Sequence, residues 1–223
     1  MRDNKGINWF AGLTTIGALA FLFLCAHDFA PRVDPDPHEA SGWAAARHAL
    51  ARLKTGGQII VITRDTTVSE NPASDLQLAS FKKTLRKARV DIAAVQSLQI
   101  DPLRPVEVPA GDFFELIRRT PSGSVIVSFM GPPLLTQAQR TQLGDIKPAI
   151  VAFCPGTMPD LVDLRSLLDQ HLLQVAIIVR REVTGAPPRK DLQGVFDRYF
   201  VALTNAPKGV VTTASFAPQP AQP

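Results

Sequence analysis

Residues 58–63 read Gln-Ile-Ile-Val-Ile-Thr, an almost unbroken run of β-branched residues between two glycines and a polar segment. A run that is apolar at nearly every position is typical of a parallel strand with helices on both faces, because such a strand has no solvent face. Further strand-forming runs follow along the chain, at 90–98, 124–129, 149–153 and 175–179. Together these runs predict five strands of one sheet.

Segments in which apolar residues recur at helical spacing separate the strands. We predict that the first of these helices is capped by Ser41 and buries one apolar stripe, formed by Trp43, Ala46, Leu50 and Leu53. A second helix follows a cap at Ser74 or Asp75. Each strand is therefore followed or preceded by a helix.

Capping patterns predict where the later helices begin. The pairs Asp112–Glu115 and Thr157–Asp160 both have the spacing of a capping box. The second pair precedes a leucine repeat that predicts one continuous helix, with Leu161, Leu164, Leu168 and Leu172 on one side. Shorter helices are predicted from Thr136 and over 191–197.

The alternation of strands and helices predicts the fold class. Right-handed crossovers between parallel strands place helices on both faces, so the expected architecture is α/β, a three-layer α/β/α sandwich. The sheet is mostly parallel with five or six strands, residues 199–203 forming the sixth at an edge, and we predict the strand order 2-1-3-4-5. In such sheets the ligand crevice lies beyond the carboxyl ends of the strands, where the winding reverses between strands one and three.

The domain plan follows from composition. The chain has 223 residues, of which 45% are hydrophobic and 20% charged, with a formal net charge of +4, and this excludes a disordered chain and a multi-span membrane protein. We predict one α/β domain over 41–204. A Pro- and Asp-rich linker over 27–40 precedes it, and a disordered tail rich in Pro, Ala and Gln follows it over 205–223.

Residues 1–26 predict a membrane segment. The run from Ile7 to Ala26 has no charged side chain, and its 20 residues match the thickness of a bilayer when helical. Arg2 and Lys5 precede the run, so we expect a single-pass transmembrane helix in a bacterial-type inner membrane, with the domain in the periplasm or extracytoplasmic space. A cleaved secretory signal and a lipoprotein signal ending at Cys25 are the two alternatives, and both also place the domain outside the cytoplasm.

Polar residues follow the predicted strands at their carboxyl ends. The loop after strand one supplies Arg64, Asp65, Thr66 and Ser69 ahead of a helix start, where free N–H groups attract anions. These residues either hold a small anionic ligand or form a solvated turn whose hydroxyl groups cap the backbone. Gly131 follows strand three and permits close backbone approach.

Strand four ends at Cys154, with Thr157 just beyond it. A thiol in this position is either acidified by the helix dipole or is a small buried residue. The candidate ligand-binding set is therefore Arg64, Asp65, Thr66, Ser69, Gly131, Cys154 and Thr157, and the sequence assigns no catalytic residue.

Several functional classes lose support because their motifs are missing. The sequence has no dinucleotide-binding glycine pattern, no phosphate-binding loop, no zinc-protease motif and no serine-hydrolase elbow, and we expect neither a cofactor nor a metal. The basic residues between 82 and 89 recur at the spacing of one helix face, which indicates a solvated surface and no nucleic-acid partner.

The stretch from Gln58 to Val95 resembles one lobe of the type I periplasmic-binding-protein fold, as in substrate-binding proteins of ABC transporters. It carries Ile-Ile-Val-Ile-Thr-Arg-Asp, then Phe81-Lys-Lys-Thr-Leu-Arg-Lys-Ala and a second strand. That family closes two lobes around a ligand, whereas this chain has material for one.

The hydrophobic segment 7–26, the expected fold with its resemblance and the missing catalytic motifs together favour a membrane-anchored module that binds a small molecule or serves a transport or envelope system, with a membrane protein as a possible partner. An envelope enzyme acting through Asp65 or Cys154 is a less favoured alternative. A ligand-free structural subunit of a membrane complex is another.

Overall fold

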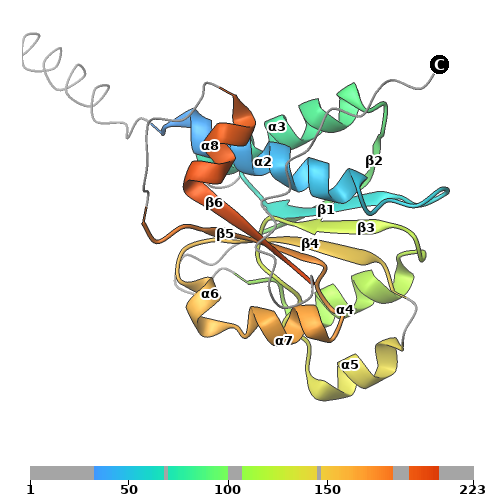
Figure 1. The fold of residues 1–223 in the computed structure, drawn as a ribbon. Helices are drawn as coiled ribbons and strands as arrows, with labels where there is room; N and C mark the ends of the chain where they lie inside the picture. Colours follow the sequence, from blue (N-terminus) through green and yellow to red (C-terminus); the bar gives the residue numbers. More distant parts are fainter. Residues whose placement is uncertain (1–32, 68–69, 100–106, 145–146, 183–190, 206–223) are drawn as a thin grey trace, which may run out of the picture. The chain divides into compact units, whose positions relative to one another are not determined.

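A computed structural model describes residues 33–67, 70–99, 107–144, 147–182 and 191–205. Six strands form one sheet in the order β2-β1-β3-β4-β5-β6 (Figure 1). Their bounds are β1 Ile59–Arg64, β2 Ile92–Leu98, β3 Val125–Ser128, β4 Ala149–Cys154, β5 Val175–Val179 and β6 Phe200–Thr204. All neighbouring pairs are parallel except β5 with β6. The predicted order 2-1-3-4-5 is present, and the antiparallel β6 extends it at one edge.

Helices cover both faces of this sheet, as a three-layer sandwich requires (Figure 1). On one face lie α2 Pro35–Leu50, α3 Pro72–Lys87 and α8 Leu192–Tyr199. On the other lie α4 Ala110–Arg119, α5 Gln137–Leu143, α6 Met158–Leu161 and α7 Leu164–Asp169. The helices between the parallel strands return the chain to the start of the next strand, which is the arrangement that the alternating sequence predicts.

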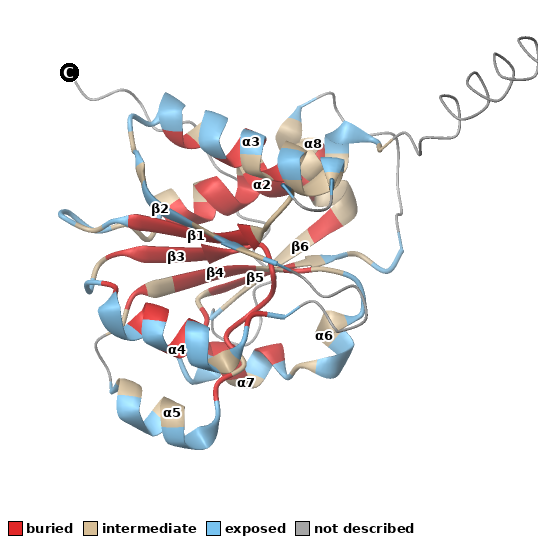
Figure 2. Ribbon diagram, turned by 180° about the vertical axis from the view of Figure 1, so that it is seen from behind, coloured by how far each residue is buried: buried red, intermediate tan, exposed pale blue. Residues whose placement is uncertain are grey.

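The sheet separates two hydrophobic cores. Successive side chains of a strand point to opposite faces, so Ile60 and Ile62 of β1 pack with α4 and α7, whereas Ile59 and Val61 pack with α2 and α3. Figure 2 shows the central strands buried along most of their length. The near-continuous apolar run at 58–63 reflects this double coverage.

The first described helix begins earlier than the sequence predicts. It starts at Pro35, so residues 35–40 of the predicted linker are helical and Ser41 is not the cap. Proline is tolerated in the first helical turn, where its missing N–H has no intrahelical acceptor. The Ser41 hydroxyl instead donates to the His38 carbonyl oxygen at 2.9 Å.

The buried face of α2 also differs from the predicted stripe. Small side chains make up most of that face, and Trp43 and Leu50 are only half-buried; the fully covered apolar residues are Ala40, Ala44, Ala45, Ala46 and Ala49. The reason is the close approach of α2 to α3, because a Cβ atom added at Gly42 would overlap the Gln77 carbonyl oxygen. Small residues therefore mark the contact with α3.

Neither of the two predicted capping boxes forms, and Thr157 is the N-cap of α6 without a side-chain cap hydrogen bond. The helix at 110–119 begins at Ala110 after Pro109, with no side-chain cap, and Glu115 pairs with Arg118 at 3.1 Å. The helix predicted from Thr136 does have a capping box, formed with Gln139.

The leucine repeat after Thr157 does not form one helix. The α6 helix ends at Leu161, and Asp163 caps a new helix by accepting from the Ser166 N–H at 2.9 Å. Between them Val162 is extended, and Leu161 is left 79% exposed. A local cap thus overrides the apolar repeat.

Within the described residues, no helix combines the length and the hydrophobicity needed to cross a bilayer. The predicted membrane segment 7–26 and Cys25 lie outside the described residues, as do Ser69 and positions 206–223 of the predicted tail.

Candidate functional site

A cavity of about 440 Å³ lies at the carboxyl ends of the parallel strands. Residues at the ends of four strands line it, together with the first turns of α2 and α3 and the junction of α8 with β6. The strand-end residues are Arg64 of β1, Phe129 and Met130 after β3, Phe153 and Pro155 around the end of β4, and Val179 of β5. This is the part of the sheet where β1 and β3 are neighbours and the winding reverses, which is where open α/β sheets bind ligands.

Aromatic rings form the apolar wall of this strand-end cavity. Phe153 packs against Phe200 with ring centroids 5.8 Å apart, and Phe200 lies 6.5 Å from the ring of Tyr199. On the other side Phe129 is held edge-on by Phe81, at 5.6 Å. Each ring is supported by another, so the wall is fixed before any ligand enters, and a flat apolar group fits against it.

The polar lining of the cavity is positive. Arg64 supplies a positive charge to the lining. No carboxylate is found among the described residues that line the cavity. No hydrogen bond or ion pair to the Arg64 guanidinium is found among the described residues. The first turn of α3 adds the positive end of a 16-residue helix. An anionic group would therefore be stabilised beside Arg64.

Neighbouring polar side chains of the cavity are already engaged. The Asn71 side chain accepts from the Ser74 N–H at 3.0 Å and caps α3. The Gln77 amide donates to the Ser41 hydroxyl at 2.8 Å. These bonds fix the α2 and α3 ends of the cavity and leave Arg64 as the group most available to a ligand.

Asp65 and Thr66, two further predicted residues of the strand-one loop, are not among the residues that line the cavity. Asp65 accepts from the backbone N–H and the hydroxyl of Thr67, at 2.9 and 2.6 Å, and these bonds lower the pKa of its carboxyl. The Thr66 hydroxyl donates to Asp75 at 2.9 Å. Asp65 thus forms a local turn with Thr67, whereas the Thr66 hydroxyl bonds a carboxylate of α3 and caps no backbone group.

The predicted residues after β3 and β4 are occupied by the protein itself. Gly131 has a φ of +99°, and a Cβ atom there would overlap the Met158 side chain. The Met158 side chain therefore occupies the space that the glycine leaves open. Cys154 is fully buried, and burial raises the pKa of its thiol to about 12. A thiol that is protonated at neutral pH and has no exposed surface does not serve as a nucleophile.

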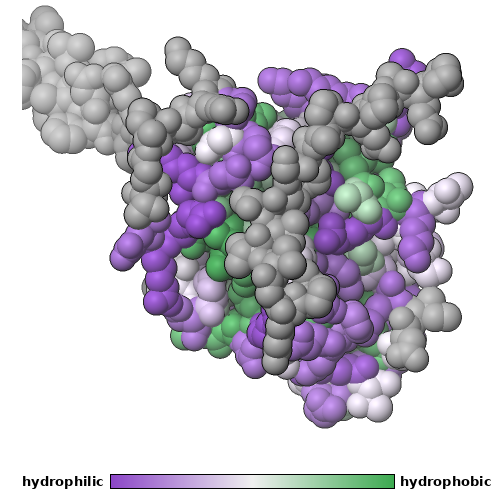
Figure 3. All heavy atoms as spheres, in the orientation of Figure 1, coloured by the Kyte–Doolittle hydropathy of each residue, from purple (hydrophilic) through white to green (hydrophobic). Residues whose placement is uncertain are grey.

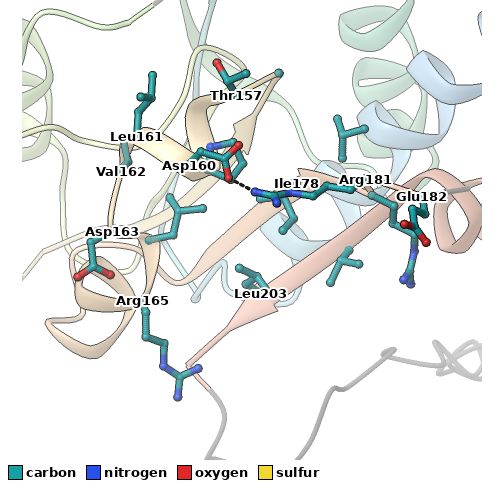
Figure 4. Close-up of a pocket in the computed structure, with 16 residues that line it drawn as sticks. Thr157, Asp160, Leu161, Val162, Asp163, Arg165, Ile178, Arg181, Glu182 and Leu203 are labelled. Carbon is teal, nitrogen blue, oxygen red and sulfur yellow. Dashed lines mark hydrogen bonds and ion pairs between the residues drawn. The ribbon is translucent and has the colours of Figure 1, made fainter.

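Thr157 lines a second hollow, an open groove of about 1160 Å³ between α6, α7 and the ends of β5 and β6. An ion pair between Asp160 and Arg181 crosses it, and Arg165 points away from this pair (Figure 4). Arg180 donates to the carbonyl oxygens of Asp197 and Phe200, at 2.8 and 3.1 Å, and so joins α8 to the sheet. These charged side chains of the groove bond other groups of the protein. We therefore regard the groove as solvated surface and the strand-end cavity as the candidate site.

Hydrophilic side chains dominate the described surface in the view of Figure 3, with smaller hydrophobic areas between them. No group of three or more histidine, cysteine or carboxylate side chains gathers among the described residues in a way that would hold a metal ion. Among its described lining residues, the strand-end cavity therefore offers a ligand the Arg64 guanidinium, the aromatic walls and the first turns of α2 and α3.

Most of the cavity lining was not predicted from the sequence. Pro37 and His38 fell in the predicted linker, and Phe129, Phe153 and Tyr199 read as core or edge-strand residues. A usable signal was present, because Phe129 directly follows β3 and Phe153 lies at the end of β4, the positions that face the crevice.

The sequence matches no protein-family model and no curated protein. Solved structures do match. A solute-binding protein of an ABC transporter from Burkholderia graminis C4D1M, in complex with D-arabinose, is 21% identical, with a TM-score of 0.45 over 63% of this chain and 47% of that one. The periplasmic component of a sugar transport system from Hahella chejuensis is 17% identical, with a TM-score of 0.45 over 64% and 49%.

A periplasmic ribose ABC transporter protein from Conexibacter woesei DSM 14684 is 11% identical, with a TM-score of 0.44 over 63% of this chain and 45% of that one. These proteins have the type I periplasmic-binding-protein fold that the sequence resembles, and the match to it is partial. The chain spans about half the length of each.

Proposed function

We propose that this chain binds a small organic molecule in the strand-end cavity, as a binding or accessory module of a transport or envelope system. The observation that carries the proposal is the cavity itself, which combines ring-supported aromatic walls with the Arg64 guanidinium at the point of the sheet where α/β folds bind ligands. Its volume of about 440 Å³ is in the range of ligand sites.

The lining favours a ligand with an anionic group and a flat apolar body. A carboxylate or phosphate beside Arg64 meets a cation with no competing acid in the described lining, and the start of α3 adds to the attraction. An aromatic or sugar ring packs against Phe153 and Tyr199. Because Arg64 is the one arginine or lysine in the described part of the lining, we expect the ligand to carry one such group.

Replacing Arg64 should remove the preference for an anion. We expect phenyl phosphate to bind the wild-type chain more tightly than neutral benzyl alcohol, with D-arabinose as a second neutral probe, because the charged contact contributes about 1.5–3 kcal/mol. Arg64→Gln should weaken phenyl phosphate binding about 10- to 100-fold and leave benzyl alcohol unchanged. Isothermal titration calorimetry measures both.

The matched control is Arg118→Gln, an exposed arginine on the opposite face that pairs with Glu115. It should bind phenyl phosphate as the wild type does. Equal affinity of the Arg64 variant and the wild type would contradict the proposed site, and so would a broad panel of anionic and neutral ring compounds in which none binds.

We further propose that residues 7–26 form a single-pass anchor in the inner membrane and hold the domain outside the cytoplasm. Alkaline phosphatase fused after residue 34 should then be active in cells, and deletion of 7–26 should abolish that activity, since the enzyme is active only after export. Intact mass of the mature chain separates a retained anchor, a cleaved signal and lipidation at Cys25. Phosphatase activity that survives the deletion would refute the anchor.

The two other interpretations fare differently. An enzyme acting through Cys154 or Asp65 receives no support from the geometry, because the thiol is buried and the carboxylate is held by Thr67. A structural subunit of a membrane complex remains compatible with the fold. The calorimetric titrations with phenyl phosphate and the other ring compounds distinguish a structural subunit from a ligand-binding module.

A further inference from the structure

The edge strand β2 differs from the buried strands of the sheet. In the described chain it pairs with β1 alone, and Ala93, Ala94 and Val95 are exposed, Val95 to 41% (Figure 2). Natural proteins protect exposed edges with charges, prolines or bulges, because an open edge invites another strand. Residues 92–98 read Ile-Ala-Ala-Val-Gln-Ser-Leu and contain neither a charge nor a proline. Pairing with β1 is regular from Ala94 to Leu98, so no bulge interrupts this part of the edge.

The direction of the backbone identifies the free hydrogen-bonding groups of β2. The Asp65 N–H donates to the Leu98 carbonyl oxygen at 2.8 Å, so the peptide groups of Leu98 face β1. Peptide groups alternate in direction along a strand. Val95 and Ser97 therefore point their N–H and C=O groups away from the sheet, toward whatever lies beyond the edge, whereas the register with β1 shifts between Ile92 and Ala94, so the alternation ends at Ala93.

We propose that a second copy of this chain occupies the edge, with the two β2 strands antiparallel about a two-fold axis at Val95. This register places Val95 opposite its own copy, so the two Val95 residues exchange both backbone hydrogen bonds. The facing side chains are small and uncharged, so the pairing brings together no like charges. Two-fold dimers are also the commonest homo-oligomers.

The charges on α3 are complementary in this arrangement. Asp75, Lys82 and Arg86 are exposed and recur at seven and four residues, which places them on one stripe of the helix. Gln77 and Ser80 contact α2, so this stripe lies on the side of α3 that faces away from α2, toward the β2 edge. A two-fold axis makes the two α3 helices antiparallel. Asp75 of each helix then lies nearer the basic residues of the other helix, and the two helix dipoles point in opposite directions.

Light scattering and sedimentation of the full chain, in one buffer and detergent, test the proposal. We expect a dimer, and we expect Val95→Lys to raise its dissociation constant at least tenfold, because two lysines would meet on the axis. Leu161→Lys is the matched control, since Leu161 is 79% exposed on α6, away from β2 and outside the lining of the strand-end cavity, and it should leave the dimer unchanged.

Crosslinking gives a second, position-specific measurement. In a Cys25→Ser background, Val95→Cys should be joined to its own copy by a short bismaleimide, whereas Leu161→Cys, 79% exposed on α6, should not. Cys154 is buried and does not compete. Hydrogen exchange should be slowed at Val95 in the wild type and fast at the same position in Val95→Lys.

A chain that stays monomeric up to about 100 µM, a concentration at which even weak specific dimers form, would overturn the proposal. So would a dimer that neither responds to Val95→Lys nor crosslinks through Val95→Cys, because its interface would lie elsewhere.

Discussion

Replacing Gly42 by alanine should lower the free energy of unfolding by about 3 kcal/mol, the upper part of the range for overpacked sites. A Cβ atom at this position would overlap the backbone carbonyl oxygen of Gln77 in α3. That oxygen belongs to a helix and cannot rotate away, so α2 and α3 must separate. The separation would also disturb the Gln77–Ser41 hydrogen bond and the two helix starts that line the strand-end cavity.

Gly111→Ala is the matched control for this prediction. Gly111 is also in a helix, α4, and a Cβ there would meet no atom within 4 Å. Alanine is the better helix former, so this variant should raise the free energy of unfolding by about 0.5–1 kcal/mol. Urea unfolding followed by circular dichroism measures both variants. Similar changes in the two variants would show that the close contact at Gly42 does not decide the outcome.

The sheet was predictable because its signal is local. The β-branched runs at 59–64, 125–128, 149–154 and 175–179 have no solvent face, and only a sheet covered on both sides buries them. The predicted order of the strands followed from handedness rules and from the sequence of helices between them. Neither step required knowledge of which helix touches which.

The helices were harder to predict, because their partners decide the buried face. The large residues Trp43 and Leu50 suggested one stripe of α2, whereas the contact with α3 selects the alanine and glycine side. The break after Leu161 depends on a cap at Asp163 that competes with the leucine repeat. Hydrophobic spacing records which residues are apolar and says nothing about how closely two helices approach.

The candidate site was predicted in position and only partly in composition. The strand-end rule predicted a site at the carboxyl edge, where the cavity lies, and it selected Arg64, which lines that cavity. The hydroxyl-rich loop forms hydrogen bonds within the protein, because short polar side chains bond neighbouring groups before they meet a ligand. The aromatic wall was missed, since Phe153 and Tyr199 have the composition of a core and face the cavity only through the placement of α8 and β6.

Acidification should weaken the fold through His48. This residue of α2 is 5% exposed, and burial, with the nearby charges of Arg52 and Arg47, lowers the pKa of its imidazole from 6.5 to about 4. Between those two pH values the unfolded chain takes up a proton on His48 and the folded chain does not. The free energy of unfolding is therefore expected to fall as the pH falls from 6.5 to 4, by up to about 1.4 kcal/mol per pH unit and about 3 kcal/mol in total.

The shape of the pH curve tests this assignment independently of any uniform loss of stability. His48→Gln should flatten the curve between pH 6.5 and 4, even if it lowers stability at every pH, whereas His171→Gln, at an exposed histidine, should keep the fall. The contribution of Asp65 lies below this window, because its lowered pKa means that its hydrogen bonds to Thr67 are lost only in stronger acid. A wild-type curve that is flat from pH 6.5 to 4 would show that His48 becomes protonated within the folded protein, and that the α2 face which buries it is open to water.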